Sequence, residues 1–307
     1  LEQVNPYLEE KIGVNIDMEV VGWGDWDTRR NVVVNTAGEY DILFTNLNTY
    51  TNDVSNGAFM DITELVQTAS PDLYASIPAD FWEAMSVDGK IYGVPAMKDS
   101  SITEYLVLAD DAFEQYAPDY DPSTFTDLTD PELTEALQAI TDGSGQAAWP
   151  LSSSAATYLT YQYDTLGAGI IGMGVKYNDP EAKVVSIFEQ PDITEYLNLL
   201  RSWYNTGIIN SDAATKPEEN AYKPCSVAQG WSGAAKTTWG PNMGVEAATT
   251  KLGPTIVSND TVRGSMNCIS ANCANPEKAL QLLELVNTDS YVRDLLYYGV
   301  QGDNWDY

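Results

Sequence analysis

The sequence predicts an α/β fold, because segments typical of a strand, a helix and a second strand follow one another near its start. Residues 14–20 alternate strictly between apolar and polar side chains, which indicates a half-buried strand. Residues 25–36 are expected to form a helix that ends at Gly38. Residues 40–45 contain a continuous apolar run, which is typical of a central parallel strand. Together these segments predict a βαβ unit.

The size and charge of the chain limit its function class. With 307 residues, of which 44% are apolar, it is long enough for two domains with sizeable cores. Its formal charge of −30, from 45 acidic and 15 basic residues, argues against nucleic acid or an anionic membrane as a partner, because both bind basic faces. The acidic residues are spread along the chain, which is typical of a solubilising surface.

The sequence has no histidine, which excludes Ser-His-Asp and Cys-His catalysis and every metal site that needs imidazole. Its three cysteines form no C-x-x-C pair, so zinc and thioredoxin-type sites are not indicated. Cys268 and Cys273 are close enough in sequence to be bridged across a turn, and the alternative is three buried thiols including Cys225. We expect no cofactor and no metal.

The first residues already resemble a helix, with Val4, Leu8 and Ile12 on one face. A natural chain rarely starts in this way. We therefore expect a chain trimmed at the N-terminus, whose first strand and any export signal are missing. No apolar stretch is long enough to span a membrane.

Further along the chain, the segment 88–99 begins as a tight turn, continues as a short apolar strand and stops at Pro95. Residues 105–109 read as a buried strand and residues 119–127 as a plain loop that resembles a calcium loop only loosely. Residues 167–172 match G-x-G-x-x-G, but they lie in the wrong context for a nucleotide site.

Amphipathic helices and a late strand complete the pattern. Each helix has an apolar stripe that predicts core packing. The stripes are Leu133, Leu137 and Ile140; Ile193, Tyr196, Leu197, Leu200, Trp203 and Tyr204; and Ala279, Leu282, Leu283 and Val286 after the cap Asn275 and Pro276. Residues 262–269 read as a strand that leads into the last helix.

The aromatic residues suggest a ligand. The chain has 8 Trp and 19 Tyr but only 6 Phe, and Trp and Tyr combine a flat apolar face with a polar edge that suits sugar rings. The tryptophans in polar, glycine-rich contexts are Trp23, Trp26, Trp231, Trp239 and Trp305. Any one of them could instead pack in the core or on the surface, but at least two of the group are expected to face a ligand.

Ligands of such sheets bind beyond the carboxyl ends of the strands. In this sequence those positions carry Asp25, between Trp23 and Trp26, and the pair Asn46 and Asn48. Both loops are therefore polar and aromatic, and the carboxylate of Asp25 is a candidate ligand contact.

Several segments together resemble a known family. Asp88-Gly-Lys-Ile-Tyr-Gly-Val-Pro95 resembles the D-G-K-x-Y-G-x-P segment of extracellular solute-binding proteins of ABC importers, the group that includes maltose-binding protein. The segments 22–29 and 38–42 are similar to the early part of its LipO-like lipoprotein branch. Further similar segments are 183–191, 203–212, 275–279 and 298–302. Their order and spacing cover most of the chain.

The resemblance implies a two-lobed, periplasmic-binding-protein-like fold of type II that closes on a ligand. The crossing hinge strands would be residues 105–109 and 262–269. Lobe 1 would contain residues 1–107 and 264–288, and lobe 2 residues 108–263 and 289–307. Relatives also continue past the segment corresponding to 298–302, so the C-terminus is expected to be trimmed too.

The resemblance also implies ligand-binding residues. Lys98 and Asp99 would lie at the cleft beside the first crossover, although an exposed ion pair is the open alternative. The loop after the strand at 40–45 would supply Asn46 and Asn48. Ser153 and Tyr158 would contribute from the second lobe, and Trp231 resembles the position of a stacking tryptophan.

The function that follows is a binding protein without chemistry of its own. We expect a monomer that captures a carbohydrate, in particular an oligosaccharide, in the cleft between the lobes and delivers it to an ABC transporter permease. The family is tethered outside the membrane by a lipidated cysteine that this chain lacks. One alternative is a glycoside hydrolase with a carboxylate pair. The other is a binding protein for peptides or amino acids.

Overall fold

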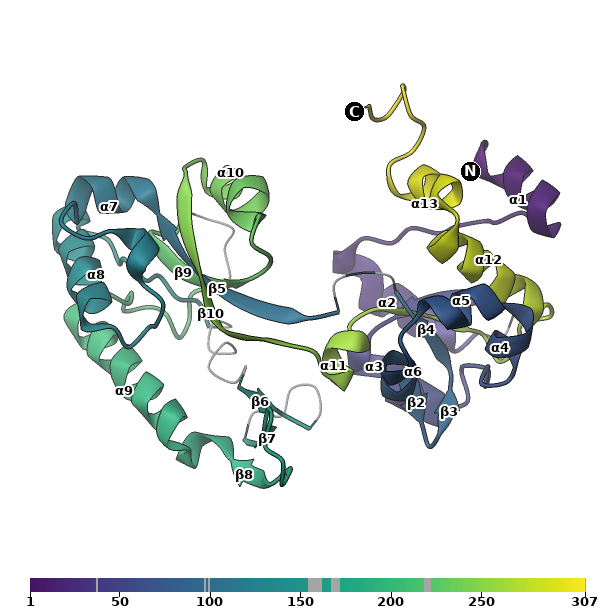
Figure 1. The fold of residues 1–307 in the computed structure, drawn as a ribbon, viewed down its shortest axis with the longest axis horizontal. Coiled ribbons are helices and arrows are strands. Elements are labelled where there is room, and N and C mark those ends of the chain that lie inside the picture. Colours follow the sequence, from purple (N-terminus) through teal and green to yellow (C-terminus); the bar gives the residue numbers. More distant parts are fainter. Residues whose placement is uncertain are drawn as a thin grey trace. The chain divides into compact units, whose positions relative to one another are not determined.

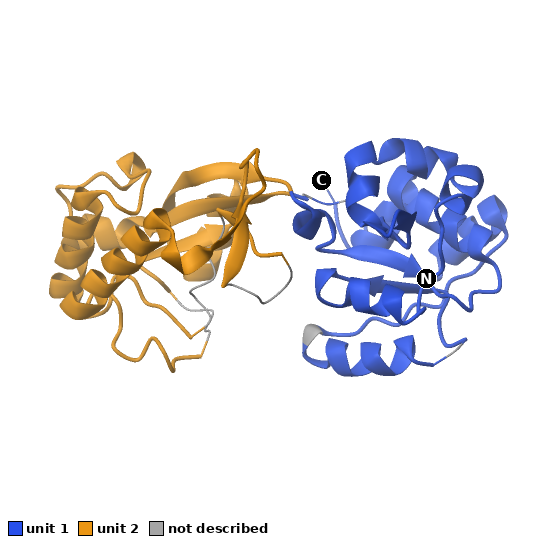
Figure 2. Ribbon diagram, turned by 90° about the horizontal axis from the view of Figure 1, so that it is seen from below, with its two compact units in different colours: residues 1–100, 258–307 blue, residues 101–257 orange. Residues whose placement is uncertain are grey.

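The structure is a computed structural model, and it describes residues 1–36, 38–96, 98, 100–153, 162–166, 172–217 and 222–306. The chain divides into two compact units (Figure 2). Unit 1 consists of residues 1–100 and 258–307, and unit 2 of residues 101–257. The chain therefore passes from one unit to the other twice.

Unit 1 combines a small sheet with helices (Figure 1). Its elements are α1 Val4–Ile12, α2 Trp23–Val34, β1 Ile42–Thr45, α3 Leu47–Ser55, α4 Leu65–Ala69, α5 Pro71–Ser76, α6 Ala79–Met85, β2 Ser86–Val87, β3 Lys90–Ile91, β4 Gly93–Pro95, α11 Asn259–Val262, β11 Met266–Ile269, α12 Pro276–Thr288 and α13 Ser290–Tyr297. The sheet order is β1-β11-β4, and both pairings are antiparallel.

Alternate residues of this sheet enter two different cores, as the pleat requires. Leu43 and Cys268 pack with residues of α2, α3 and α6. Ile42 and Ile269 pack with residues of α4, α5 and α12. The sheet is thus covered by helices on both faces.

The predicted βαβ unit is wrong. Residues 14–20 form no strand, and β1 is an edge strand whose described partner, β11, is antiparallel. Instead, the side chain of Asn5 in α1 bonds the backbone of Ile16, which donates from N at 2.9 Å and accepts at O at 3.0 Å. Val14 and Ile16 pack against the core formed by α1, α12 and α13, whereas Met18 and Val20 are 48% and 82% exposed, so no strand-like buried face extends along the segment.

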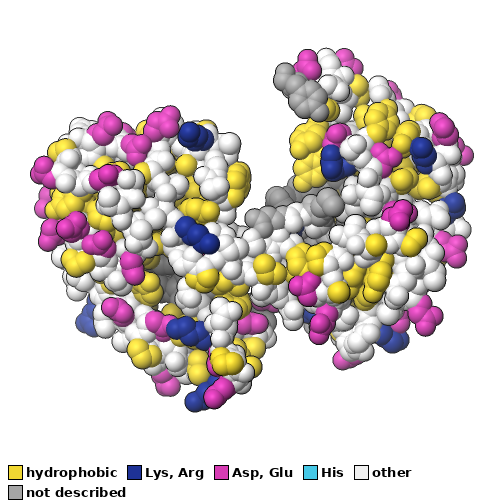
Figure 3. Space-filling view, viewed as in Figure 1, with side chains coloured by type: hydrophobic (Ala, Val, Ile, Leu, Met, Phe, Trp, Pro, Cys, Tyr) yellow, Lys and Arg dark blue, Asp and Glu magenta, His cyan; other side chains and the backbone are white. Residues whose placement is uncertain are grey.

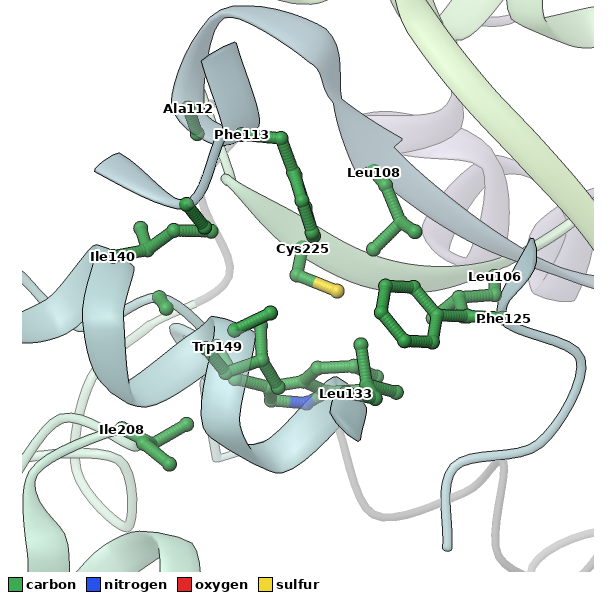
Figure 4. Packing of buried hydrophobic residues seen from close by; sticks show 14 of the residues in the cluster. Leu106, Leu108, Ala112, Phe113, Phe125, Leu133, Ile140, Trp149, Ile208 and Cys225 are labelled. Carbon is green, nitrogen blue, oxygen red and sulfur yellow. The ribbon is translucent and has the colours of Figure 1, made fainter. Parts of the chain in front are cut away.

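Unit 2 is built on a second sheet, of order β10-β5-β9, again antiparallel. Its elements are β5 Ile102–Ala109, α7 Asp110–Tyr116, η1 Pro122–Thr124, α8 Pro131–Ser144, β6 Tyr163–Asp164, β7 Met173–Lys176, β8 Val184–Ser186, η3 Ile187–Glu189, α9 Pro191–Thr206, β9 Cys225–Gln229, the π-helix η4 Ala235–Trp239, α10 Gly240–Met243 and β10 Ala247–Ile256. Figure 4 shows the core between this sheet and the helices, where Leu106, Leu108 and Cys225 face Leu133 and Trp149.

The unit boundaries differ from the predicted lobes. Residues 289–307 belong to unit 1, whereas the sequence analysis assigned them to lobe 2. The physical reason is that α13 packs on α1 and α12, and the Tyr7 hydroxyl donates to the Asp289 carboxylate at 2.7 Å. The whole of β5 belongs to unit 2, and residues 258–263 belong to unit 1.

Several local predictions are confirmed. The predicted tight turn joins β2 and β3, and Asp88 and Gly89 both have positive φ, at 52° and 76°. Residues 119–127 form a loop that contains only the short turn η1. The predicted strand 262–269 is shorter, because Val262 ends α11 and β11 begins at Met266. The G-x-G-x-x-G segment lies largely outside the described residues.

Of the two alternatives for the cysteines, the structure has the three buried thiols and not the Cys268–Cys273 bridge. All three cysteines are free and buried, and burial raises the pKa of each thiol. They act as small apolar side chains in the cores.

The surface is acidic, as the composition indicates. Figure 3 shows acidic side chains scattered over the visible face of both units rather than gathered in one patch. Among the described residues, no helix is long and apolar enough to cross a bilayer.

Candidate functional site

An aromatic pair covers one face of the unit 2 sheet. Leu106 and Leu108 point into the core, so Tyr105 between them points to the opposite face. There its ring packs against Trp239 at the end of η4, with ring centroids 5.6 Å apart and planes tilted by 52°.

The loop after β9 carries a second tryptophan beside this pair. Gly230 N donates to Thr103 O at 3.0 Å, which fixes the start of the loop to β5. The next residue, Trp231, is 53% exposed, and its carbonyl accepts from Ala234 N at 2.9 Å. We call Tyr105, Gly230, Trp231 and Trp239 the aromatic surface of unit 2. It offers a half-buried ring pair and one freely accessible indole.

Gly230 is required by close packing. A Cβ at this position would lie 2.5 Å from the Trp239 ring and 3.3 Å from Ala234 Cβ. Gly230→Ala is therefore expected to displace Trp239 from Tyr105 and to lower the free energy of unfolding by about 1–3 kcal/mol. Urea denaturation and near-UV circular dichroism measure the two effects. Gly24→Ala, where the added Cβ meets open space on α2, is the matched control, and equal effects in the two variants would contradict the argument.

Polar groups lie at the same end of the sheet. Glu104 on β5 is paired in register with Gln229, the last residue of β9, which is exposed. Glu104 is half-buried, and desolvation raises the pKa of its carboxyl to about 8. Glu104 and Gln229 share the face of Leu106 and Leu108, so the carboxyl and the amide point away from the face that carries Tyr105 and Trp239.

The predicted site residues on α2 and α3 have mostly local structural roles. Trp26 packs edge-on against Phe44, with centroids 5.4 Å apart, and Asp25 is exposed in the first turn of α2. Asn46 caps α3, because its side chain accepts from the backbone N of Asn48 at 3.1 Å. Asn46 and Asn48 follow β1, and Asp25 and Trp26 lie in α2. Since β1 pairs in the antiparallel sense and no strand precedes α2, these residues do not lie at the carboxyl ends of parallel strands as expected. Trp23 begins α2, and its side chain lies outside the described part of the structure.

Two pairs of predicted residues are described only in part. Lys98 is exposed, and a Cβ at Gly264 would lie 3.2 Å from its Nζ, whereas Asp99 lies outside the described residues. Ser153 is exposed, and its backbone N donates to Lys216 O at 2.9 Å, whereas Tyr158 lies outside the described residues.

Trp305 lies in a tight turn at the end of unit 1. Its Nε1 donates to Gly299 O at 3.0 Å, and its ring is 5.8 Å from that of Tyr298. Its polar edge is therefore used within the turn, and only part of the ring face is accessible.

Unit 1 contains a polar hollow that the sequence did not indicate. It has a volume of about 400 Å³ and lies at the end of the sheet where β1 begins. Its lining residues are Asn31, Val34, Asn35, Thr36, Tyr40, Asp53, Asn56, Gly57, Ala58, Ser270 and Asn272. Behind it, the buried Arg30 forms an ion pair with Asp53. No group of three or more His, Cys, Asp or Glu in the described ranges is arranged to hold a metal ion.

Sequence reasoning did not indicate that Tyr105 lies on the aromatic surface, because the segment 105–109 is typical of a buried strand. The available signal is the polar edge of a tyrosine in an otherwise apolar strand.

Comparisons with known proteins agree with this architecture. The model of a family described as bacterial extracellular solute-binding protein matches residues 2–302. A carbohydrate ABC transporter substrate-binding protein of Streptococcus pneumoniae serotype 4 is 25% identical over 315 residues, which cover all of this chain. The chain spans 62% of the length of that relative.

Solved structures show the same fold. The N-glycan transport solute binding protein NgtS from Streptococcus pneumoniae is 24% identical, with a TM-score of 0.87 over 100% of this chain and 67% of its own. A cyclic alpha-maltosyl-1,6-maltose binding protein from Arthrobacter globiformis is 17% identical, with a TM-score of 0.56 over 92% of this chain and 70% of its own. The predicted α/β fold of the type II periplasmic-binding-protein class is confirmed. Because the family model covers almost the whole sequence, the chain belongs to the bacterial extracellular solute-binding protein family.

Proposed function

We propose that the chain is the substrate-binding component of an ABC transporter. It captures a carbohydrate, in particular an oligosaccharide, and delivers it to a membrane permease without making or breaking bonds. The observation that carries this proposal is the exposed indole of Trp231, which directly follows Gly230, where Gly230 packs against the Trp239 ring of the Tyr105–Trp239 pair.

The chemistry of this surface suits a sugar. The faces of aromatic rings pack against the C–H faces of sugar rings, and carboxyl and amide groups bond to the hydroxyl rim. The relative NgtS has been solved in complex with Man1GlcNAc and with Man5GlcNAc. Neutral mannose-containing oligosaccharides are therefore the first ligands to test.

The remaining predicted contacts are part of the proposal. Besides Trp231 and Trp239 they are Trp23, Asp25, Trp26, Asn46, Asn48, Lys98, Asp99, Ser153, Tyr158 and Trp305. Those with the weakest support are Trp26 and Asn46, since packing against Phe44 and capping of α3 already account for them. The predicted cleft between lobes stays a prediction.

The family is described as extracellular, and the protein is proposed to be anchored by a lipidated cysteine on the extracellular face of the membrane. It is proposed to act as a monomer until it meets its permease.

Trp231→Ala tests the site. A thermal-shift screen against a glycan panel that includes Man5GlcNAc should identify a ligand, since binding to the folded state at about 100 times Kd adds about 2.7 kcal/mol of stability. Trp231→Ala should remove most of that shift, because loss of a central aromatic contact typically costs about 2 kcal/mol or more. The unliganded melting temperature should hardly change, because the indole is exposed.

Tyr204→Ala is the matched control, since this exposed aromatic residue of the same unit lies on α9 and should keep the full shift. An unchanged shift in Trp231→Ala would remove Trp231 from the site. Formation of shorter sugars during incubation would favour the hydrolase alternative instead.

A further inference from the structure

The polar hollow of unit 1 is separate from the aromatic surface of unit 2. Its lining comes from the C-terminal ends of α2 and α3 and from the residues before β1 and after β11, all of which belong to unit 1. The hollow lies where β1 begins, whereas Asn46 and Asn48 follow the end of that strand. Its volume of about 400 Å³ lies within the range of about 300–1,000 Å³ that is typical of small-molecule sites.

Backbone hydrogen bonds hold the walls of the hollow in place. Ala271 N, after β11, donates to Ala58 O, after α3, at 2.9 Å. Ser270 N donates to Asp41 O, just before β1, at 2.9 Å. Both bonds join segments that are far apart in the sequence. The walls are therefore preformed, which reduces the ordering that a ligand would have to supply on binding.

A buried ion pair balances the charge of the hollow. Asp53 lines the hollow and is 7% exposed, and its carboxylate accepts from the guanidinium of Arg30, which is 3% exposed. The described lining contains no Lys or Arg, and α2 and α3 both end there, where helix dipoles carry a partial negative charge. The hollow therefore has little attraction for an anion.

The lining is rich in groups that both donate and accept hydrogen bonds. Its amide and hydroxyl side chains are Asn31, Asn35, Asn56, Asn272, Thr36, Tyr40 and Ser270. Within the described ranges, the side-chain amides of Asn31, Asn56 and Asn272 form no hydrogen bond, and all three residues are exposed. These amides are therefore available to a ligand from three different segments of the chain.

These properties favour one class of ligand. A calcium ion needs several carboxylates, and the described residues hold no group of three or more His, Cys, Asp or Glu that could bind a metal. An apolar ligand would leave the amides in the lining unpaired. The hydroxyl group of a polyol can accept from one amide and donate to the next, and it brings no charge that the protein must balance.

We propose that the polar hollow of unit 1 is a second binding site, which takes a small uncharged polyol the size of a single sugar ring. The amides of Asn31, Asn56 and Asn272 bond to the hydroxyl groups of this ligand. The site goes beyond the proposed function and does not depend on it, because the hollow and the aromatic surface belong to different units.

Ligand-observed NMR titration tests the site. The protein carries Trp231→Ala throughout, so that the exposed indole of unit 2 contributes no ring stacking. The probes are D-mannose and myo-inositol, which are neutral, D-glucuronate, which is anionic, and D-glucosamine, which is cationic at about pH 6. At least one neutral probe should bind with a Kd below about 10 mM, and both charged probes should bind at least about tenfold more weakly.

Two substitutions locate the binding. Asn31→Leu and Asn272→Leu keep the approximate side-chain volume but remove the amide, so each should weaken binding of the neutral probe about fivefold. Asn52→Leu, which removes an exposed amide of α3 outside the hollow, is the matched control and should keep the full affinity.

Three results would each overturn the inference: no binding of either neutral probe, equally tight binding of a charged probe, or equal affinity in Asn31→Leu, Asn272→Leu and the control. Far-UV circular dichroism shows that the variants compared are folded. Failure of the wild-type protein to bind any oligosaccharide of the glycan panel would overturn the proposed function alone, since the hollow is no part of it.

Discussion

Trp203→Ala is expected to lower the free energy of unfolding of unit 2 by about 3–5 kcal/mol. Trp203 lies on α9 and is fully buried in the core of this unit. Its ring is 5.0 Å from that of Trp149, and its Nε1 donates to Thr134 Oγ1 at 3.0 Å. The substitution removes a large apolar surface and leaves the Thr134 hydroxyl without this donor, and both effects favour the unfolded chain.

Urea denaturation followed by far-UV circular dichroism measures the loss, with each unit's transition fitted separately because a chain of two units need not unfold in one step. The neighbouring Tyr204→Ala is the control, since that ring is 48% exposed and its removal should cost less than about 1 kcal/mol. Similar losses in the two variants would show that α9 does not pack as described.

Asp53→Ala is expected to lower the free energy of unfolding of unit 1 by about 3–5 kcal/mol. Arg30 is buried on α2 and forms its ion pair with Asp53 of α3. Burial already lowers the pKa of Arg30, and its Nε has no hydrogen-bond partner among the described residues. Removal of the carboxylate would leave a buried guanidinium without its counter-charge.

Replacement of both partners separates the ion pair from simple packing. Arg30→Met combined with Asp53→Leu removes both charges and keeps apolar volume, so its stability should lie close to that of the wild type. Urea denaturation of the single and double variants gives the coupling between the two sites. A double variant no more stable than Asp53→Ala would contradict the role of the ion pair.

The helices could be predicted because their signals are local. The stripe of Leu133, Leu137 and Ile140 is buried in α8, and Trp203 is buried in α9 as predicted. The strands were less predictable, because a strand also needs a neighbour. Residues 14–20 have the alternation of a strand but are held by Asn5 of α1 instead, whereas β1 pairs with residues more than two hundred positions further along.

The candidate site was predictable only in part. Trp231 could be chosen because a tryptophan between glycine and serine has few core contacts to make, and it is exposed. Asn46 could not be told from a helix cap, and Tyr105 could not be told from a core residue, because both distinctions depend on which segments pack beside them.

The sequence by itself determined the α/β class, the amphipathic helices, the hairpin at Asp88 and Gly89, and the family through segments such as 88–95. These features depend on periodicity, turn geometry and local composition, which act between near neighbours. Only the tertiary structure decided the antiparallel pairing of β1 with β11, the membership of residues 289–307 in unit 1, and the packing of Tyr105 against Trp239 on one face of the unit 2 sheet. These features depend on contacts between distant segments, whose burial sets both the packing of each side chain and the charge it can carry.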